Sequence, residues 1–231
     1  MVYTFWEGEM PDYLKLCLTT WDFPYIVLNK VTVEYHTDFD IHKVLKRYTL
    51  PQVADCVRVH VLRDNADAYW LDVDTIMLTR KMNFPETIMG DPVERTNTIG
   101  YLHSKKIKEK FFTRWADYQD KRISMKITHK EWNTMGNAFT DDYVKAYRKI
   151  KIRDITPSWP ETYMIKEDIH RQYKYEKFYF ENSYSLKDIK PTKILMLHNS
   201  WTPEWYKKLT VKQILTEDKC TLSNIFREKL L

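Results

Sequence analysis

The first 28 residues alternate between strand and helix signals, and this order restricts the fold more than any other feature of the chain. The sequence predicts a strand at Val2–Trp6, a helix at Asp12–Thr20 and a buried strand at Tyr25–Leu28. The helix follows Pro11 and carries apolar residues at helical spacing. Because strands joined by a helix commonly pair in parallel, we expect an α/β fold with a mostly parallel central sheet flanked by helices.

The rest of the chain continues this alternation. Strands are expected at Ala68–Leu78, Thr87–Gly90, Thr98–Leu102 and Lys193–Leu197, and helices at Ile41–Leu50, Val53–Leu62, Lys105–Ile123, Phe139–Tyr147 and Thr210–Leu231. The segment Val53–Leu62 also alternates as a strand would, and we favour the helix. The length fits one large domain or two small ones, and because the chain shows no repeat or linker we expect a single domain over 1–231.

The composition argues against several classes of protein. No apolar run approaches the length of a membrane-spanning helix, and the first residues lack the pattern of a signal peptide. The net charge of +5 is spread along the chain instead of forming one basic stripe, which argues against a nucleic-acid partner. Cys17, Cys56 and Cys220 lie far apart, and we expect reduced thiols. We therefore expect a soluble, cytoplasmic protein.

Two aspartates, Asp72 and Asp74, occur within the strongest strand signal of the chain. Residues i and i+2 of a strand face the same side, with Cα atoms roughly 6.5 Å apart. Paired carboxylates repel each other unless a cation or a proton relieves the repulsion. Ligands gather at the carboxyl ends of strands in α/β sheets, and hard divalent cations prefer carboxylate and phosphate oxygens. The pattern predicts a metal–diphosphate site; two exposed loop aspartates are the alternative.

Residues after one other strand, and on the helix before the aspartate pair, could complete such a site. His198 follows the apolar strand at Lys193–Leu197, and a neutral imidazole is a good ligand for Mn(II)-like ions. Trp201 could close over a bound sugar or diphosphate, or simply pack. Asp55 and Arg58 would share one helix face, where the arginine could bind phosphate or form an ordinary surface ion pair.

Taken together, the order of these residues resembles a known enzyme family. The relevant residues are Phe5-Trp6-Glu7-Gly8, Pro11, Cys17, Trp21, Ala54-Asp55, Arg58, Tyr69-Trp70-Leu71-Asp72-Val73-Asp74 and His198-Asn199-Ser200-Trp201. Their order is similar to GT-A glycosyltransferases of the capsular-polysaccharide and DXD sugar-binding type, and more narrowly to small viral enzymes that glycosylate capsid proteins. The resemblance covers residues 1–80 and 193–206. It departs from the family at Asn65–Ala68, where the family often has a glycine pair.

The resemblance implies a single GT-A-like, Rossmann-like domain, with a nucleotide-sugar-binding part in 1–100 and an acceptor-side part with a C-terminal helix in 101–231. The expected metal ligands are Asp72, Asp74 and His198, and the expected donor-binding residues are Thr4, Phe5, Trp6, Asp55, Arg58, Asp72 and Trp201. The implied activity moves a hexose or deoxyhexose from a nucleotide diphosphate sugar, UDP rather than GDP, to a glycan or glycoprotein acceptor. The implied cofactor is Mn(II) or Mg(II), and a viral relative would act in the host cytoplasm.

The stereochemical outcome determines whether a catalytic base is needed. An inverting enzyme needs a carboxylate to deprotonate the acceptor hydroxyl, and Asp141 or Asp142 is the candidate by position. Both could instead cap a helix and complement its dipole. A retaining enzyme needs no such base.

Three rival interpretations use the same residues. Asp72-Val73-Asp74-Thr75 also fits the haloacid-dehalogenase phosphatases, and Met89-Gly90-Asp91-Pro92 resembles their later acidic motif. In that family the DxD strand opens the domain, whereas here it follows long strand and helix signals. A glycoside hydrolase could use Asp72 and Asp74 as its carboxylate pair, which would leave His198 without a role. The third interpretation is a carbohydrate-binding protein without activity.

Overall fold

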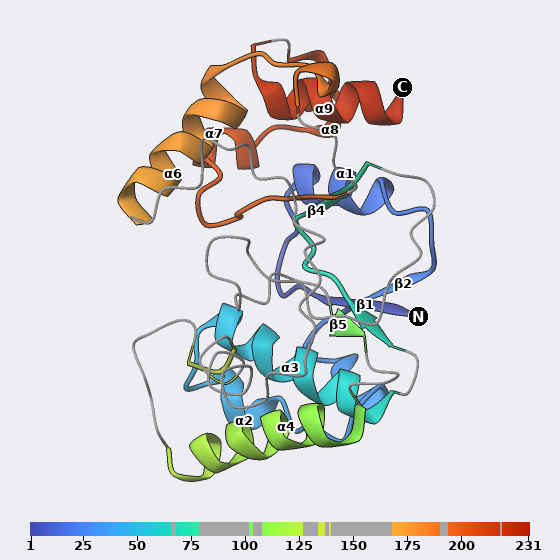
Figure 1. The fold of residues 1–231 in the computed structure, drawn as a ribbon, viewed down its shortest axis with the longest axis vertical. Coiled ribbons are helices and arrows are strands. Elements are labelled where there is room, and N and C mark those ends of the chain that lie inside the picture. The colour runs from blue at the N-terminus through green and yellow to red at the C-terminus, as the bar shows by residue number, and fades with distance from the viewer. Residues whose placement is uncertain are drawn as a thin grey trace. The chain divides into compact units, whose positions relative to one another are not determined.

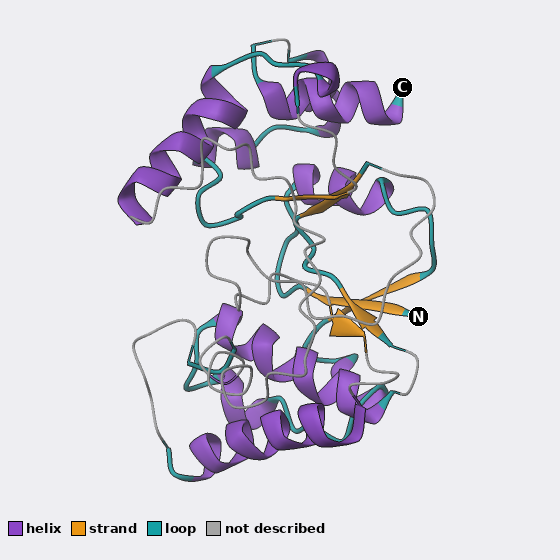
Figure 2. Cartoon of the chain, in the orientation of Figure 1, coloured by secondary structure: helices purple, strands orange, loops and turns teal. Residues whose placement is uncertain are grey.

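The computed structural model describes residues 1–65, 68–78, 102–103, 108–126, 134–136, 139, 168–189, 194–217 and 219–231. These residues form a mixed α/β structure (Figures 1 and 2). The chain groups into two compact units: unit 1 comprises 1–8, 23–72 and 83–155, and unit 2 comprises 9–22, 73–82 and 156–231. The expected single domain over 1–231, with its parts divided at residue 100, stays a prediction.

Unit 1 contains a sheet whose centre is parallel, as predicted. Strand β1 (Val2–Phe5) pairs in parallel with β2 (Tyr25–Leu28) on one side and with β3 (Tyr69–Trp70) on the other. The short strand β5 (Leu102–His103) adds antiparallel to β3, giving the order β2-β1-β3-β5. Because β1 and β3 run in the same direction, their carboxyl ends lie on the same edge of the sheet.

Unit 1 contains several helices, and the sequence supplies a capping box at the start of the longest one packed on the sheet, α3. Their bounds are η1 Val33–Tyr35, α2 His42–Leu45, α3 Leu50–Asp64 and α4 Lys108–Ser124. The backbone N–H of Thr49 donates to Gln52 Oε1 at 3.1 Å, which is half of a capping box. Pro51 lies in the first turn of α3, where its missing N–H costs no helical hydrogen bond. The predicted helix at Ile41–Leu50 was too long, because α2 ends at Leu45 and Leu50 already begins the next helix.

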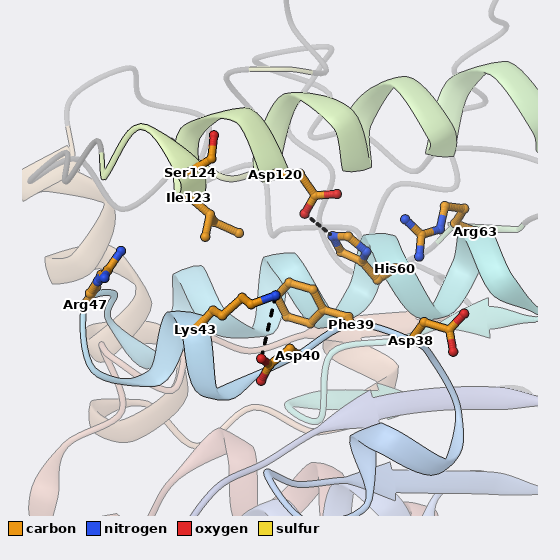
Figure 3. Close-up of a pocket in the computed structure, with 10 residues that line it drawn as sticks. All are labelled: Asp38, Phe39, Asp40, Lys43, Arg47, His60, Arg63, Asp120, Ile123 and Ser124. Atoms are coloured by element: carbon orange, nitrogen blue, oxygen red, sulfur yellow. Dashed lines mark ion pairs between the residues drawn. The ribbon is translucent and has the colours of Figure 1, made fainter.

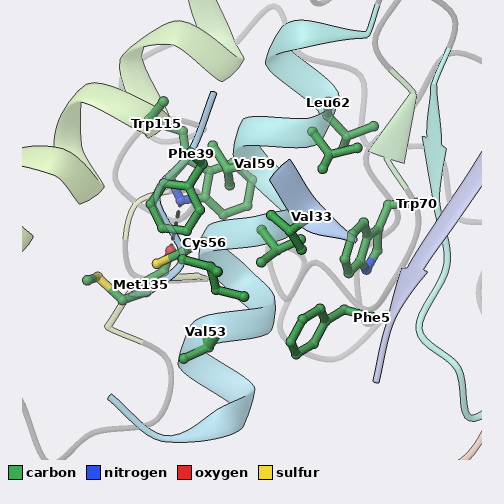
Figure 4. Close-up of a cluster of buried hydrophobic side chains, with 14 of the residues drawn as sticks. Phe5, Val33, Phe39, Val53, Cys56, Val59, Leu62, Trp70, Trp115 and Met135 are labelled. Atoms are coloured by element: carbon green, nitrogen blue, oxygen red, sulfur yellow. Dashed lines mark hydrogen bonds between the residues drawn. The ribbon is translucent and has the colours of Figure 1, made fainter. Parts of the chain in front are cut away.

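The hydrophobic core of unit 1 lies on both sides of α3, which packs against the sheet on one side and against α4 on the other (Figure 4). Tyr3 and Phe5 of β1 belong to it, while Thr4, which alternates with them along the strand, is buried outside this cluster. Cys56 of α3 and Trp115 of α4 are both fully buried in the cluster. This packing fixes α3 against β1 and β3, and it thereby fixes the polar residues that α3 carries.

Unit 2 combines a two-stranded sheet with helices. Its elements are α1 Asp12–Thr19, β4 Thr75–Met77, α6 Asp168–Glu176, the π-helical turn η3 Lys177–Glu181, η4 Leu186–Asp188, β6 Ile194–Met196, α7 Glu204–Lys207, α8 Val211–Thr216 and α9 Thr221–Leu230. Strands β4 and β6 pair antiparallel. The segment after α1 holds β4, because Trp21 Nε1 donates to Thr75 O and Met77 N donates to Thr20 Oγ1, both at 2.8 Å.

The predicted continuous strand at Ala68–Leu78 was wrong in its middle. Only β3 and β4 are strands, and they belong to different sheets. Leu71 N still donates to Tyr3 O at 3.1 Å, after which residues 71–74 leave the sheet and a turn forms at Val73 and Asp74. Thr75 then pairs with Met196 of β6. The two aspartates thus lie in the connection, where aspartate is a common turn residue, and not on one strand face.

The remaining predictions have different outcomes. The C-terminal helical tail is confirmed, but α8 and α9 are separate helices. The expected strand at Thr87–Gly90, most of the expected strand at Thr98–Leu102 and most of the expected helix at Phe139–Tyr147 fall outside the described residues. Free, buried thiols are confirmed for all three cysteines. Within the described ranges, no helix has both the length and the apolar character needed to cross a membrane.

Candidate functional site

In unit 1, Arg58 holds a carboxylate at the end of β3. Arg58 lies on α3 and is only 6% exposed. Its Nη2 donates to Asp72 Oδ1 at 2.8 Å, and its Nη1 lies 3.5 Å from Asp55 Oδ1. Trp70 Nε1 donates to the same Asp72 oxygen at 2.9 Å. The Asp72 side chain is 30% exposed, and among the described residues nothing donates to its Oδ2, so this oxygen can accept from a ligand.

Asp55, the second carboxylate beside Arg58, is buried beneath the loop at Gly136. A Cβ at Gly136 would lie 2.5 Å from Asp55 Oδ2, so the backbone approaches the carboxylate more closely than any side chain would allow. Burial raises the pKa of Asp55 to about 7; Arg58 opposes this shift, and the charge of Asp72 adds to it. Asp55 therefore gains or loses its proton near neutral pH. The predicted juxtaposition of Asp55 and Arg58 on one helix face is confirmed.

We expect the buried charge of Asp55 to make folding less favourable as the pH rises. Between about pH 4 and 7, the folded protein keeps a proton on Asp55 that the unfolded chain has released, because the pKa is about 7 when folded and 3.8 ordinarily. The stabilisation from this proton is complete below the ordinary pKa of Asp55 and is lost as the pH rises through the folded pKa. The total loss in the free energy of unfolding is on the order of 4 kcal/mol. Asp55→Asn should therefore gain free energy of unfolding relative to wild type across this interval.

Urea denaturation of both proteins at several pH values measures this gain. The difference in free energy of unfolding between the two proteins isolates Asp55, because both proteins contain His60. Burial lowers the pKa of His60 to about 3, so this residue adds its own pH dependence to each protein. His60 contributes stability that is lost as the pH falls below its ordinary value of 6.5, which gives an opposite slope. Asp38→Asn removes an exposed charge from the same unit and serves as the control for the loss of one aspartate. A constant difference for Asp55→Asn would contradict the raised pKa.

In unit 2, the residues on both sides of His198 donate hydrogen bonds to Asp74. Leu197 N donates to the backbone oxygen of Asp74 at 2.8 Å, which extends the β4–β6 pairing by one bond. Asn199 N donates to the carboxylate oxygen Oδ2 of Asp74 at 3.1 Å. Asp74 and His198 therefore occupy adjoining positions at the end of the two-stranded sheet. The sequence predicted that these two residues belong together, although it placed them on a parallel sheet.

The segment from His198 to Thr202 forms a closed turn. Thr202 Oγ1 and Trp201 N each donate to the backbone oxygen of His198 at 3.0 Å. The rings of His198 and Trp201 lie 4.0 Å apart between centroids, at an angle of 30°. Tyr175 OH accepts from His198 N at 3.1 Å. The turn thus fixes both the backbone and the ring environment of His198.

The donor set of unit 2 suits a divalent cation that is shared with a phosphorylated ligand. Asp74 offers a carboxylate and His198 an imidazole, the combination that Mn(II)-like ions accept. Across the described residues, no three His, Cys, Asp or Glu side chains gather to hold a metal by themselves. Ions of this kind commonly take one or two protein carboxylates and fill their other positions with phosphate oxygens and water. The residues present therefore fit a metal that binds together with a diphosphate.

The predicted nucleotide-contacting residues occupy different environments. The parallel register places the end of β1 on the same sheet edge as Asp72. Thr4 is fully buried, and its Oγ1 has no hydrogen-bond partner among the described residues. The Phe5 side chain packs in the core of unit 1, whereas Trp6 is half-buried. The candidate base residues Asp141 and Asp142 lie outside the described residues.

Sequence reasoning missed several groups that hold the candidate residues in place. Trp70, predicted only as part of a strand, donates to Asp72. Trp70 lies two residues before Asp72, and this spacing could have indicated the contact, because alternate residues of a strand share a face. The contact of Tyr13 with Asn199, which in turn donates to Asp74, gave no comparable signal, since it joins residues 186 positions apart.

Unit 1 also contains a cavity of about 540 Å³ that the sequence did not predict (Figure 3). His60, at its wall, stacks on Phe39 with ring centroids 4.2 Å apart, and its Nε2 lies 3.6 Å from Asp120 Oδ1. The lining residues are Asp38, Phe39, Asp40, Lys43, Arg47, His60, Arg63, Asp120, Ile123 and Ser124. Three cationic and three anionic side chains balance each other, so the lining favours no particular charge on a ligand.

Comparisons with known proteins identify no relative. No protein-family model, no curated protein and no solved structure matches this chain.

Proposed function

We propose that this chain is a metal-dependent glycosyltransferase with a GT-A-like fold. It would move a hexose or deoxyhexose from a nucleotide diphosphate sugar, with UDP preferred over GDP, to a glycan or glycoprotein acceptor. The observation that carries the proposal is the position of Asp74 beside His198, held by hydrogen bonds from Leu197 N and Asn199 N. Asp74 is the second aspartate of the DxD motif. Together with His198 it offers the carboxylate and the imidazole that we propose as metal ligands.

In this proposal Asp74 and His198 hold Mn(II) or Mg(II) at the donor diphosphate. A cation bound there would neutralise the negative charge that develops on the departing diphosphate. His198 is restrained by its contact with the Trp201 ring. Trp201 is half-buried and keeps part of its surface for the diphosphate or the sugar.

Within unit 1, Asp72 is the proposed acceptor for a hydroxyl group of a ligand. Asp72 keeps Oδ2 for a hydroxyl group, while Arg58 and Trp70 fix its other oxygen. Hydrogen bonds to sugar hydroxyls from such a fixed carboxylate give orientation and specificity. The charge-assisted hydrogen bond from the Arg58 guanidinium, at 2.8 Å, holds the Asp72 carboxylate in a fixed orientation.

A thermal-shift screen with UDP, GDP, TDP and CMP, each with and without Mn(II), tests the proposal. We expect UDP to stabilise the protein only when Mn(II) is present, since metal and diphosphate complete each other's sites. At a hundredfold excess over the dissociation constant the gain is about 2.7 kcal/mol, or roughly 5–10 °C for a chain of this length. A protein that no nucleotide stabilises, but that hydrolyses a generic phosphate ester with Mg(II), would replace the proposal with the phosphatase interpretation.

A further inference from the structure

We propose that two buried tyrosines of unit 2, Tyr13 and Tyr175, are positioning residues that orient Asp74 and His198 through the turn at 198–202. The inference rests on the proposed function, because it assigns a role toward the proposed metal ligands. Tyr13 belongs to α1 and Tyr175 to α6. Neither residue was predicted to take part in the site.

The first contact runs from α1 to Asp74. Tyr13 OH donates to Asn199 Oδ1 at 2.5 Å, and Asn199 N donates to Asp74 Oδ2 at 3.1 Å. Asn199 therefore connects the tyrosine hydroxyl to the carboxylate with its side chain and its backbone. Burial and the nearby charge of Asp74 both raise the pKa of Tyr13, so its hydroxyl remains a donor at any ordinary pH.

The second contact runs from α6 to His198. Tyr175 OH accepts from His198 N at 3.1 Å and lies 3.2 Å from Thr202 Oγ1. Its ring meets the rings of His198 and Trp201 edge-on, each with centroids 5.8 Å away. One tyrosine thus contacts the first and last residues of the turn and also the two aromatic rings that the turn presents.

The hydroxyl groups of these tyrosines have a use that packing alone does not explain. Both side chains are fully buried, and a phenylalanine would fill nearly the same volume without a polar atom to desolvate. Both hydroxyls are directed to one five-residue turn, although they come from helices far apart in the chain. Groups that hydrogen-bond to metal ligands fix their orientation, and removing such a group commonly weakens metal affinity about 10- to 100-fold.

Three tyrosine-to-phenylalanine variants separate positioning from packing. Tyr13→Phe and Tyr175→Phe remove the two proposed contacts. Tyr206→Phe is the matched control, because Tyr206 is equally buried in unit 2 but bonds Ser223 of α9 at 3.0 Å. Mn(II) binding in the presence of UDP is measured from the electron paramagnetic resonance signal of free Mn(II), and stability is measured by thermal unfolding without either ligand.

We expect Tyr13→Phe and Tyr175→Phe to weaken Mn(II) binding by about 10-fold or more, with Tyr206→Phe retaining the wild-type affinity at a similar loss of stability. Asn199→Ala provides a second route if a tyrosine variant does not fold, since it removes the acceptor of Tyr13 but keeps the backbone donor to Asp74. The double variant Tyr13→Phe/Asn199→Ala should lose no more affinity than either single variant, because both interrupt one contact.

Two results would overturn the inference. One leaves the proposed function standing, and the other refutes it as well. If wild type binds Mn(II) with UDP, Asp74→Asn does not, and the tyrosine and Asn199 variants keep wild-type affinity, the positioning role is refuted and the proposed function stands. If wild type itself fails to bind Mn(II) with UDP, the proposed function and the positioning role are both refuted.

Discussion

Asp74→Asn should lower metal-dependent hydrolysis of a UDP-sugar donor by about 10²- to 10³-fold, the usual effect of removing one preorganised electrostatic group. Asparagine keeps an oxygen that can accept from Asn199 N, so the turn beside His198 should remain closed. It lacks the negative charge that a divalent cation requires from a carboxylate. The loss should therefore appear in activity and in Mn(II) affinity, with the thermal unfolding temperature nearly unchanged.

Asp22→Asn is the control for this experiment, because Asp22 is an exposed aspartate of the same unit. It should retain wild-type turnover and Mn(II) affinity. His198→Ala should weaken Mn(II) binding as well, since it removes the proposed nitrogen ligand. Wild-type turnover in Asp74→Asn would remove the metal role from this residue, and an unchanged Mn(II) titration in His198→Ala would remove the histidine from the site.

Arg58→Ala should lower the free energy of unfolding by roughly 3–5 kcal/mol, the usual cost of breaking a buried ion pair from one side. The arginine is almost entirely buried and is the cation between Asp55 and Asp72. Without it, the pKa of Asp55 should rise further, because burial then acts unopposed. The destabilisation should consequently be smaller in acid, where Asp55 is protonated, than above neutral pH.

Arg63→Ala is the matched control on the same helix. Arg63 pairs with Asp64, and both side chains are about a quarter exposed, so the expected loss is below about 1 kcal/mol. Urea denaturation of both variants at acid and alkaline pH gives the comparison. Adding Asp55→Asn to Arg58→Ala should recover part of the loss, because it removes the carboxylate left without its cation. Equal midpoints for the two arginine variants would show that the Arg58 pair contributes little.

The local parts of the fold were predictable from sequence because they depend on short-range periodicity. Strand β2 was predicted to the residue, and the ends of β1 and α1 to within one residue. The parallel pairing followed from the order of these elements. The i, i+3 spacing of Asp55 and Arg58 likewise gave their common helix face. Each of these inferences needs only residues that are close in the chain.

The errors arose where distant segments decide the structure. The apolar run from Ala68 to Leu78 reads as one strand, but its first half pairs with β1 and its second half with β6, which lies some 120 residues later. Nothing within the run marks this change of partner. The buried environment of Asp55 and the contact between Tyr13 and Asn199 were equally unpredictable, because both depend on packing between remote segments.

The close approach of Gly136 to Asp55 has a consequence for variation in this chain. Even a methyl group at position 136 would overlap the carboxylate, so the two positions are sterically coupled. A natural or engineered variant with alanine at 136 should need a shorter residue at 55, and then Arg58 would lose its buried acidic neighbour. In saturation mutagenesis, we therefore expect substitutions of Gly136 to be tolerated only when residue 55 is also replaced by a smaller one.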